Sequence, residues 1–160
     1  DEPVLLSDYT ARPFLLKWSE PFLQGRVLDL GCGEGYVARN LARRGCRRID
    51  GVDMSVEMIQ LAKKSEADDP LGIRYLAGDA RDLSILETAS YDLVLAVFLF
   101  NYLDLSDTTK VLSQFKRVRS ASIKEDSLSA KSPLTWRSSA FRAAISAAWV
   151  STTPSSSSIR

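Results

Sequence analysis

The most constraining feature of this sequence is a run of alternate glycines between an apolar segment and a helical pattern. The apolar segment Val27–Leu30 is followed by Gly-Cys-Gly-Glu-Gly at residues 31–35, and apolar residues at helical spacing continue over residues 36–44. Three glycines at one junction carry a backbone-entropy cost that needs a reason. A strand, a glycine turn and a helix in this order are typical of a nucleotide-binding turn. The sequence therefore predicts a ligand site here, and a glycine-rich connection without a ligand is the alternative.

Strand and helix patterns alternate through the first 118 residues. Each short apolar run is followed by a segment with apolar residues at helical spacing, and such alternation implies a parallel sheet with right-handed crossovers. Ser55 is placed to cap the second helix, and Gly45 to end the first. The expected strands cover residues 27–30, 49–53, 73–77 and 91–98, and the expected helices cover residues 36–44, 55–64 and 107–118.

Composition excludes several classes of protein. The chain has 160 residues, of which 45% are hydrophobic, enough for one domain with a real core. Its longest apolar run is too short to cross a bilayer, and two cysteines cannot build a disulfide scaffold. There is no histidine, which removes any His-based triad or metal site, and the net charge of +1 argues against a general nucleic-acid binder. We expect a cytoplasmic protein without metal, membrane or nucleic-acid partner. The chain begins at Asp1 and not at Met, so the sequence leaves open whether a targeting segment precedes it.

Acidic residues around the glycine turn indicate which ligand it binds. Asp29 precedes the turn and Glu34 lies inside it, and carboxylates there would repel a pyrophosphate at the helix N-terminus. A dinucleotide turn would also need glycine at position 36, where Tyr36 stands. Asp53 ends the second expected strand and can accept both ribose hydroxyls of NAD or of another adenosine ligand. A cationic adenosine ligand fits best, and a nicotinamide dinucleotide is the alternative.

Four ordered segments resemble the landmarks of class I S-adenosylmethionine-dependent methyltransferases. They are Asp-Leu-Gly-Cys-Gly-Glu-Gly at 29–35, Gly-Val-Asp-Met-Ser at 51–55, Gly-Asp-Ala at 78–80 and Tyr-Asp-Leu-Val at 91–94. The resemblance covers residues 25–118. It implies a doubly wound, mostly parallel sheet with strand order 3-2-1-4, in which the later strands are missing or replaced. It also implies that the cofactor is S-adenosylmethionine, which carries an ammonium and a sulfonium but no phosphate.

The resemblance assigns one set of residues to the methionyl half of this cofactor. Asp29 would fix the amino group, and Val97 and Phe98 would face the methionyl and sulfonium end. The turn itself would cradle the methionyl part and the ribose with Gly31, Cys32 and Gly33. Cys32 is interpreted as a small residue that fits a crowded turn rather than as a nucleophile.

A second set is assigned to the adenosine half. Asp53 would accept the ribose hydroxyls, Met54 would pack on the adenine, and Asp79 would accept a hydrogen bond from the adenine amino group, with Ala80 beside it. Each residue has a simpler alternative. Asp53 could begin a turn, Met54 could belong to the core, and Asp79 could cap the segment that follows it.

Methyl transfer needs little acid–base chemistry, because aligning the sulfonium with its acceptor supplies much of the rate. The lack of histidine therefore does not exclude it. No Asn-Pro-Pro-Tyr segment follows the fourth expected strand, so a small-molecule acceptor is the default. Its identity, the catalytic residues and the oligomeric state stay unassigned. A module that binds the cofactor without transferring methyl and an NAD(P)-binding oxidoreductase are the alternatives, and the aromatics Phe98, Phe100 and Tyr102 either line a substrate pocket or cover the sheet.

The flanking segments differ from this core. Residues 1–24 are expected to form a helical cap, with Tyr9 and Trp18 as candidates to cover the cofactor. Residues 119–160 contain thirteen serines and no glycine. The family would continue here with Leu-Lys-Pro-Gly-Gly and a fifth strand, so we expect a spliced, frameshifted or mispredicted tail that is mostly irregular. Such a tail would leave the cofactor half-site while weakening or abolishing methyl transfer.

Overall fold

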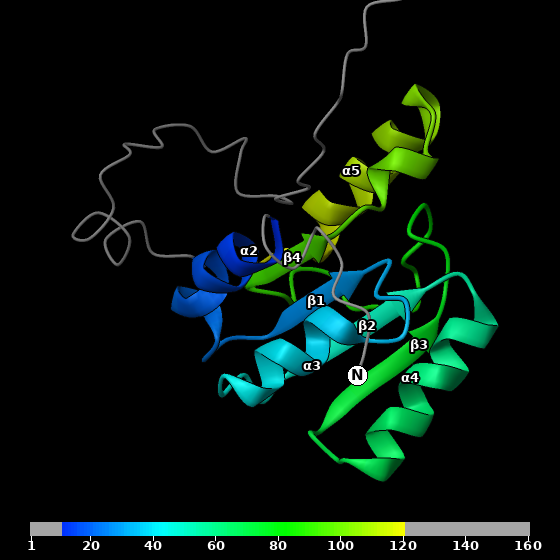
Figure 1. Ribbon diagram of the computed structural model, residues 1–160. Coiled ribbons are helices and arrows are strands. Elements are labelled where there is room, and N and C mark those ends of the chain that lie inside the picture. Colours follow the sequence, from blue (N-terminus) through cyan, green and yellow to red (C-terminus); the bar gives the residue numbers. More distant parts are fainter. Residues whose placement is uncertain (1–10, 121–160) are drawn as a thin grey trace, which may run out of the picture.

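A parallel sheet carries the fold. The computed structural model describes residues 11–120, and within them the strands follow the order β3-β2-β1-β4, which confirms the expected topology (Figure 1). The strands are β1 (Val27–Leu30), β2 (Ile49–Asp53), β3 (Ile73–Ala77) and β4 (Leu93–Ala96). All three pairings are parallel. The fourth strand is shorter than expected, because Tyr91 makes only an isolated bridge to Arg119 and the chain turns at Phe98 with a φ of 61°.

Helices cover both faces of this sheet, as a doubly wound fold requires. Figure 1 shows α3 and α4 on one side and α5 on the other. The helices are α2 (Ala11–Ser19), α3 (Tyr36–Arg43), α4 (Val56–Asp68) and α5 (Leu105–Val118), with short 3₁₀ turns η1 (Glu20–Phe22) and η2 (Phe100–Tyr102). No helix in residues 11–120 has both the length and the apolar character needed to span a bilayer.

Two apolar cores lie on the two faces because successive residues of a strand point to opposite sides. The first core packs Leu41 of α3 and Ile59 of α4, with α2, against the strand residues Val27, Ile49 and Ile73. The second packs Val111 and Phe115 of α5 against the strand residues Leu28, Leu30 and Val94. Because β1 is buried over its whole length, it forms the centre of both cores.

Capping side chains set where the helices begin. The Ser55 hydroxyl accepts a hydrogen bond from the Met58 N–H at 3.2 Å, as expected. Asp104 accepts one from the Asp107 N–H at 2.7 Å, so α5 starts earlier than the sequence pattern indicated. Within α5, Val111 and Phe115 are buried, whereas Leu112 is 40% exposed.

The helix α2 presents its aromatic residues to solvent. Leu15 and Leu16 are buried, whereas Phe14 and Trp18 are 59% and 54% exposed, with ring centroids 6.1 Å apart. Phe14 and Trp18 therefore lie on the solvent-exposed face of α2. Tyr9 and the tail from residue 121 onward lie outside the described residues, so the expectations for them have no structural counterpart here.

A buried carboxylate on the α5 side of the sheet links β2 to β3 and to the residues that precede β1 and β4. Asp50 in β2 is 5% exposed and accepts hydrogen bonds from Arg74 at 2.7 and 2.8 Å, from Arg26 at 3.0 Å and from the Tyr91 hydroxyl. Burial alone would raise the pKa of Asp50, but the hydrogen bonds from Arg74 and Tyr91 hold it below its ordinary value. Asp50 is therefore a structural anchor, separate from the glycine turn.

Candidate functional site

Two adjoining cavities lie where the parallel strands end. Their volumes are about 320 and 430 Å³, and Gly31, Val97 and Phe98 line both of them. The carboxyl ends of parallel strands share one edge of the sheet, where a doubly wound fold binds its ligand. The structure places all nine residues assigned from the sequence around these cavities: Asp29, Gly31, Cys32, Gly33, Asp53, Met54, Asp79, Ala80 and Val97. Their role as cofactor contacts stays a prediction.

The glycine turn opens toward the first cavity. The backbone N–H of Gly31 donates to the Val52 carbonyl at 2.8 Å, which fixes the turn against β2. Gly33 has a φ of 54°, and a Cβ built there would meet no heavy atom within 4 Å. Gly35, with a φ of 91°, has no such room, because the ring of Tyr75 occupies the space where its Cβ would lie. Gly33 thus exposes bare backbone to a ligand, while Gly35 allows close packing.

Asp29 carries an unsatisfied buried carboxylate at the wall of the first cavity. The residue is 1% exposed, and its carboxylate accepts a hydrogen bond from the backbone N–H of Ala38 in α3. Its Oδ2 has no hydrogen-bond partner among the described residues. Burial raises the pKa of Asp29 to about 7, and the nearby charge of Asp53 adds to the effect. A buried acceptor without a partner costs free energy, so the cavity suits a ligand that brings a cationic donor.

Asp53 connects the end of β2 to the glycine turn. Its Oδ2 accepts the Gly33 N–H at 2.8 Å, and its Oδ1 accepts the Ser55 N–H at 2.9 Å. Gly33 and Asp53 therefore meet at one site, as the sequence predicted. Each carboxylate oxygen keeps a further lone pair, enough for two ribose hydroxyls. The neighbouring Met54 is 72% exposed at the second cavity, which excludes the alternative that it belongs to the core.

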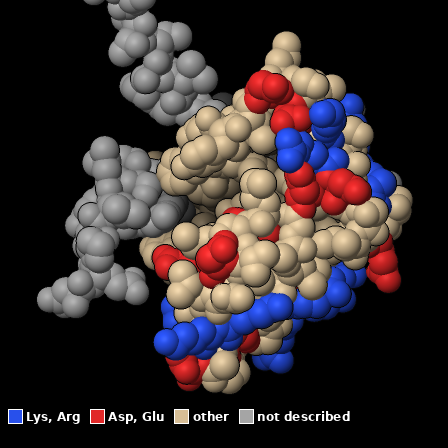
Figure 2. All heavy atoms as spheres, turned by 90° about the vertical axis from the view of Figure 1, so that its right-hand side faces the viewer, with Lys and Arg blue, Asp and Glu red and all other residues tan. Residues whose placement is uncertain are grey.

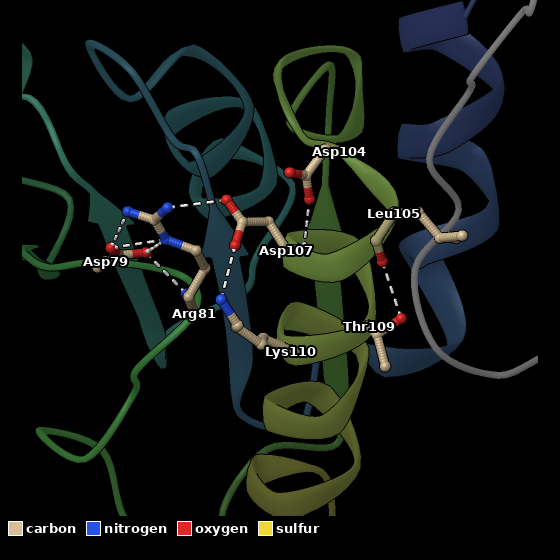
Figure 3. A network of polar contacts seen from close by, with 7 residues as sticks. All are labelled: Asp79, Arg81, Asp104, Leu105, Asp107, Thr109 and Lys110. Atoms are coloured by element: carbon tan, nitrogen blue, oxygen red, sulfur yellow. Dashed lines mark hydrogen bonds and ion pairs between the residues drawn. The ribbon is translucent and has the colours of Figure 1, made fainter.

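Asp79 lines the second cavity and belongs to a network of charged side chains (Figure 3). Arg81 binds both of its carboxylate oxygens and also reaches Asp107 in α5, which pairs in turn with Lys110. The Arg81 backbone N–H donates to Asp79 Oδ1 at 2.8 Å, so the capping alternative describes part of the geometry. Sequence reasoning missed Arg81 and Asp107 as lining residues. The only signal for Arg81 was its position two residues after Asp79.

The aromatic residues after β4 divide between the cavity and the core. Phe98 lines both cavities in a backbone conformation that non-glycine residues rarely adopt. Tyr102 lines the second cavity and is 87% exposed. Phe100 instead packs on Phe115 in α5, with ring centroids 6.0 Å apart. Phe98 and Tyr102 therefore lie at the cavities and Phe100 packs in the core, and a substrate-binding role for the first two stays a prediction.

Several further residues line the first cavity. Tyr36, Val37 and Met58 line the first cavity and were not assigned from the sequence, whereas Glu34 was recognised only as an acid in the turn. Burial of the Cys32 thiol raises its pKa far above its ordinary value, so this cysteine is not a reactive nucleophile.

The basic residues at the end of α3 contact acids and backbone of the same chain. Arg43 pairs with Asp69 at 2.9 Å, and Arg48 donates to the Gln24 carbonyl at 3.0 Å. Figure 2 shows a band of Lys and Arg low on one face, with acidic side chains beside it, and mixed charges higher up. This pattern is typical of a solvated surface with local ion pairs.

A doubly wound sheet whose acidic glycine turn meets three carboxylates at one edge defines a Rossmann-like class that binds a cationic adenosine cofactor. The family model described as a methyltransferase domain matches residues 27–121. The chain belongs to this methyltransferase-domain family, and its cofactor is S-adenosylmethionine. The residues fit that cofactor, because the unpaired Asp29 oxygen suits an ammonium and the open Gly33 backbone leaves room for the ligand.

Curated relatives and solved structures agree with this assignment. The malonyl-[acyl-carrier protein] O-methyltransferase of Priestia megaterium is 34% identical over 93 residues, covering 56% of this chain and 32% of the relative. A ubiquinone biosynthesis O-methyltransferase of Neisseria meningitidis serogroup C is 37% identical over 70 residues, covering 43% and 29%. The chain thus spans about a third of the length of these relatives.

Among solved structures, an S-adenosylmethionine-dependent methyltransferase from Mesorhizobium loti matches with a TM-score of 0.59 and 28% identity, covering 71% of this chain and 50% of that one. A protein from Pyrococcus horikoshii OT3 matches with a TM-score of 0.63 and 29% identity, covering 71% and 54%. The architecture derived above is therefore that of S-adenosylmethionine-dependent methyltransferases.

Proposed function

We propose that this chain binds S-adenosylmethionine across the two cavities and directs its methyl group to an oxygen of a small-molecule acceptor. The observation that carries the proposal is the unpaired Oδ2 of Asp29, a buried acid beside the glycine turn. A pyrophosphate at this place would meet a carboxylate, whereas the cofactor's ammonium would satisfy it. The choice of oxygen is supported by the two curated relatives named above, which are both O-methyltransferases.

The proposal gives each carboxylate one part of the cofactor. Asp29 binds the ammonium, Asp53 accepts from the ribose hydroxyls, and Asp79 accepts from the adenine amino group beside Met54. The methionyl and adenosine halves then lie in the first and second cavities, and their junction falls at the lining residues that the cavities share. The division into a core of residues 25–118 with flanking segments 1–24 and 119–160 belongs to the same proposal.

The protein's own contribution to methyl transfer is positioning. The cofactor supplies an activated methyl group, and alignment of the acceptor with it can account for much of the rate. Phe98 stands at the shared part of the two cavities, where its fixed backbone holds a wall beside the reacting end. Met54, Leu99 and Leu103 add an apolar lining to the second cavity.

Calorimetry on the 160-residue chain tests the proposal. We expect S-adenosylhomocysteine to bind and NADH not to bind, and we expect Asp29→Asn to weaken S-adenosylhomocysteine binding. Arg43→Ala serves as a matched control, since this exposed residue lies away from both cavities. Binding of NADH without S-adenosylhomocysteine would overturn the assignment in favour of an oxidoreductase.

A second assay addresses the transfer step. The chain is incubated with S-adenosylmethionine carrying a labelled methyl group and with a panel of small hydroxyl- and carboxyl-bearing acceptors. Label in an O-methyl product supports the full proposal. Binding of the cofactor without methyl transfer to any acceptor would contradict the proposed transfer step and leave the chain as a cofactor-binding module.

A further inference from the structure

Arg81 bridges the carboxylates of Asp79 and Asp107 at the second cavity. Its Nε lies 3.0 and 2.9 Å from Asp79 Oδ1 and Oδ2, and one of its terminal nitrogens lies 2.6 Å from Oδ2. The other terminal nitrogen donates to Asp107 Oδ2 at 2.8 Å. Figure 3 shows the guanidinium held between these two acids. Both acids and Arg81 line the cavity assigned above to adenosine.

The contacts with Arg81 leave the Asp79 carboxylate little free capacity to accept hydrogen bonds. An ionised carboxylate has about four lone-pair sites, two on each oxygen. Three N–H groups of Arg81 bind these sites: the backbone N–H binds Oδ1, a terminal N–H binds Oδ2, and the Nε–H is shared between both oxygens. Three donors on four sites leave room for one further donor. Asp79 is therefore held in one orientation with a single acceptor direction left for a ligand.

The second carboxylate fixes the guanidinium itself. Asp107 lies in the first turn of α5, where its backbone N–H is bound by Asp104, and its Oδ1 accepts from Lys110 Nζ at 3.0 Å. Asp107 is thus well fixed, and Arg81 connects the loop after β3 to the start of α5. A lysine would reproduce only part of this contact, because an ammonium lacks the planar fork that binds both oxygens of one carboxylate while reaching a second.

We propose that Arg81 is a positioning residue that sets the base specificity of the cofactor site, by holding Asp79 as an oriented acceptor for the 6-amino group of adenine. The inference rests on the function proposed above and extends it to a residue outside the assigned cofactor contacts. Hydrogen bonds from Arg81 keep the pKa of Asp79 below its ordinary value, so the carboxylate stays ionised. An ionised acceptor attracts a 6-amino group and repels the carbonyl oxygen of a 6-oxo purine.

The experiment compares S-adenosylhomocysteine with its 6-oxo analogue S-inosylhomocysteine, in which a carbonyl replaces the 6-amino group and N1 carries a hydrogen. Calorimetry gives the ratio of their dissociation constants for the unmodified chain, Arg81→Lys, Arg81→Ala and Asp107→Ala. Arg43→Ala is the matched control, because it removes an arginine–aspartate pair outside the cavities. Thermal unfolding of each protein shows whether it is folded.

We expect the unmodified chain and the control to prefer S-adenosylhomocysteine strongly, and Arg81→Ala to lower that preference by about tenfold, the order expected when one oriented charged hydrogen bond is lost. Arg81→Lys and Asp107→Ala should lower it by a smaller factor, since each keeps part of the network. A merely structural role would weaken both ligands equally and leave the ratio unchanged.

The outcomes separate this inference from the function on which it rests. An unmodified chain that fails to bind S-adenosylhomocysteine overturns both. Selective binding by the unmodified chain, with an unchanged ratio in the Arg81 variants, overturns the role of Arg81 alone. If Arg81→Ala does not fold, the ratios for Arg81→Lys and Asp107→Ala decide in the same way.

Discussion

Replacing Asp29 with asparagine should remove a pH dependence of cofactor binding that this one carboxyl creates. Asp29 is almost fully buried, and burial raises its pKa to about 7. Below that pH the carboxyl is protonated and neutral, so it attracts an ammonium only weakly. Binding of the ammonium favours the ionised form and therefore releases a proton. Affinity for S-adenosylhomocysteine should rise with pH through this range.

The magnitude follows from the ionised fraction of Asp29. If the ammonium binds only the ionised carboxylate, the association constant scales with that fraction. With a pKa of about 7, the fraction increases about tenfold between about pH 6 and about pH 8, which corresponds to about 1.4 kcal/mol. Asparagine has no charge to titrate, so the same interval should change its affinity by much less.

The assay is calorimetric titration at several pH values with two ligands. S-adenosylhomocysteine carries the ammonium, and 5′-methylthioadenosine keeps the adenosine but lacks the amino-acid part. Titration of the first ligand's own amino group affects both proteins equally and cancels in their ratio. An unmodified chain whose affinity for S-adenosylhomocysteine is flat with pH, or varies equally for 5′-methylthioadenosine, would refute the assignment of the ammonium to Asp29.

Three further substitutions test the site and the fold. Asp53→Ala should weaken S-adenosylhomocysteine binding by about 1–3 kcal/mol in calorimetry, since it removes the proposed ribose acceptor; an unchanged affinity would exclude Asp53 from the site. Asp50→Asn should lower the free energy of unfolding in urea by about 2 kcal/mol, and the difference should shrink below about pH 4, where a carboxylate of lowered pKa loses its charge and its contribution. Gly35→Ala should destabilise by about 1–3 kcal/mol and more than Gly33→Ala, because both need a positive φ but only Gly35 also faces the Tyr75 ring; equal losses would contradict the packing argument.

Apolar patterning was sufficient for the sheet but not for the ends of its elements. Apolar runs that alternate with helical spacing predicted a parallel sheet, and the resemblance to methyltransferases implied the observed order β3-β2-β1-β4. The fourth run was expected to extend to Phe98, yet β4 ends at Ala96. Val97 and Phe98 line the cavities. In the sequence, apolar residues that line a cavity cannot be distinguished from apolar residues that are buried in a strand. The start of α5 was misplaced because the cap at Asp104 precedes an exposed Leu105.

The candidate site was predictable where it depends on local chain order. The acid before the glycine turn and the acid at the end of β2 stand at positions that the strand–turn–helix geometry fixes. Contacts between distant segments were not predictable. Arg81 and Asp107 are 26 positions apart and meet only because α5 packs across the loop after β3. Likewise, the sequence places Asp29 at the turn but cannot show that one of its oxygens lacks a partner.

The three carboxylates at this edge are equal in charge but differ in how the protein holds them. Asp29 is buried with one oxygen unsatisfied, so its ionisation depends on a cation that arrives with the ligand. Asp53 is oriented by backbone N–H groups, including that of Gly33, which leaves lone pairs for neutral hydroxyls. Asp79 is kept ionised by Arg81, which leaves one direction for an amino group. A ligand with a cationic amino group, two vicinal hydroxyls and a neutral amine matches all three, whereas a pyrophosphate would face repulsion from Asp29. We therefore expect selectivity for S-adenosylmethionine over a dinucleotide to depend on the environments of these acids, since a glycine turn alone serves both kinds of cofactor.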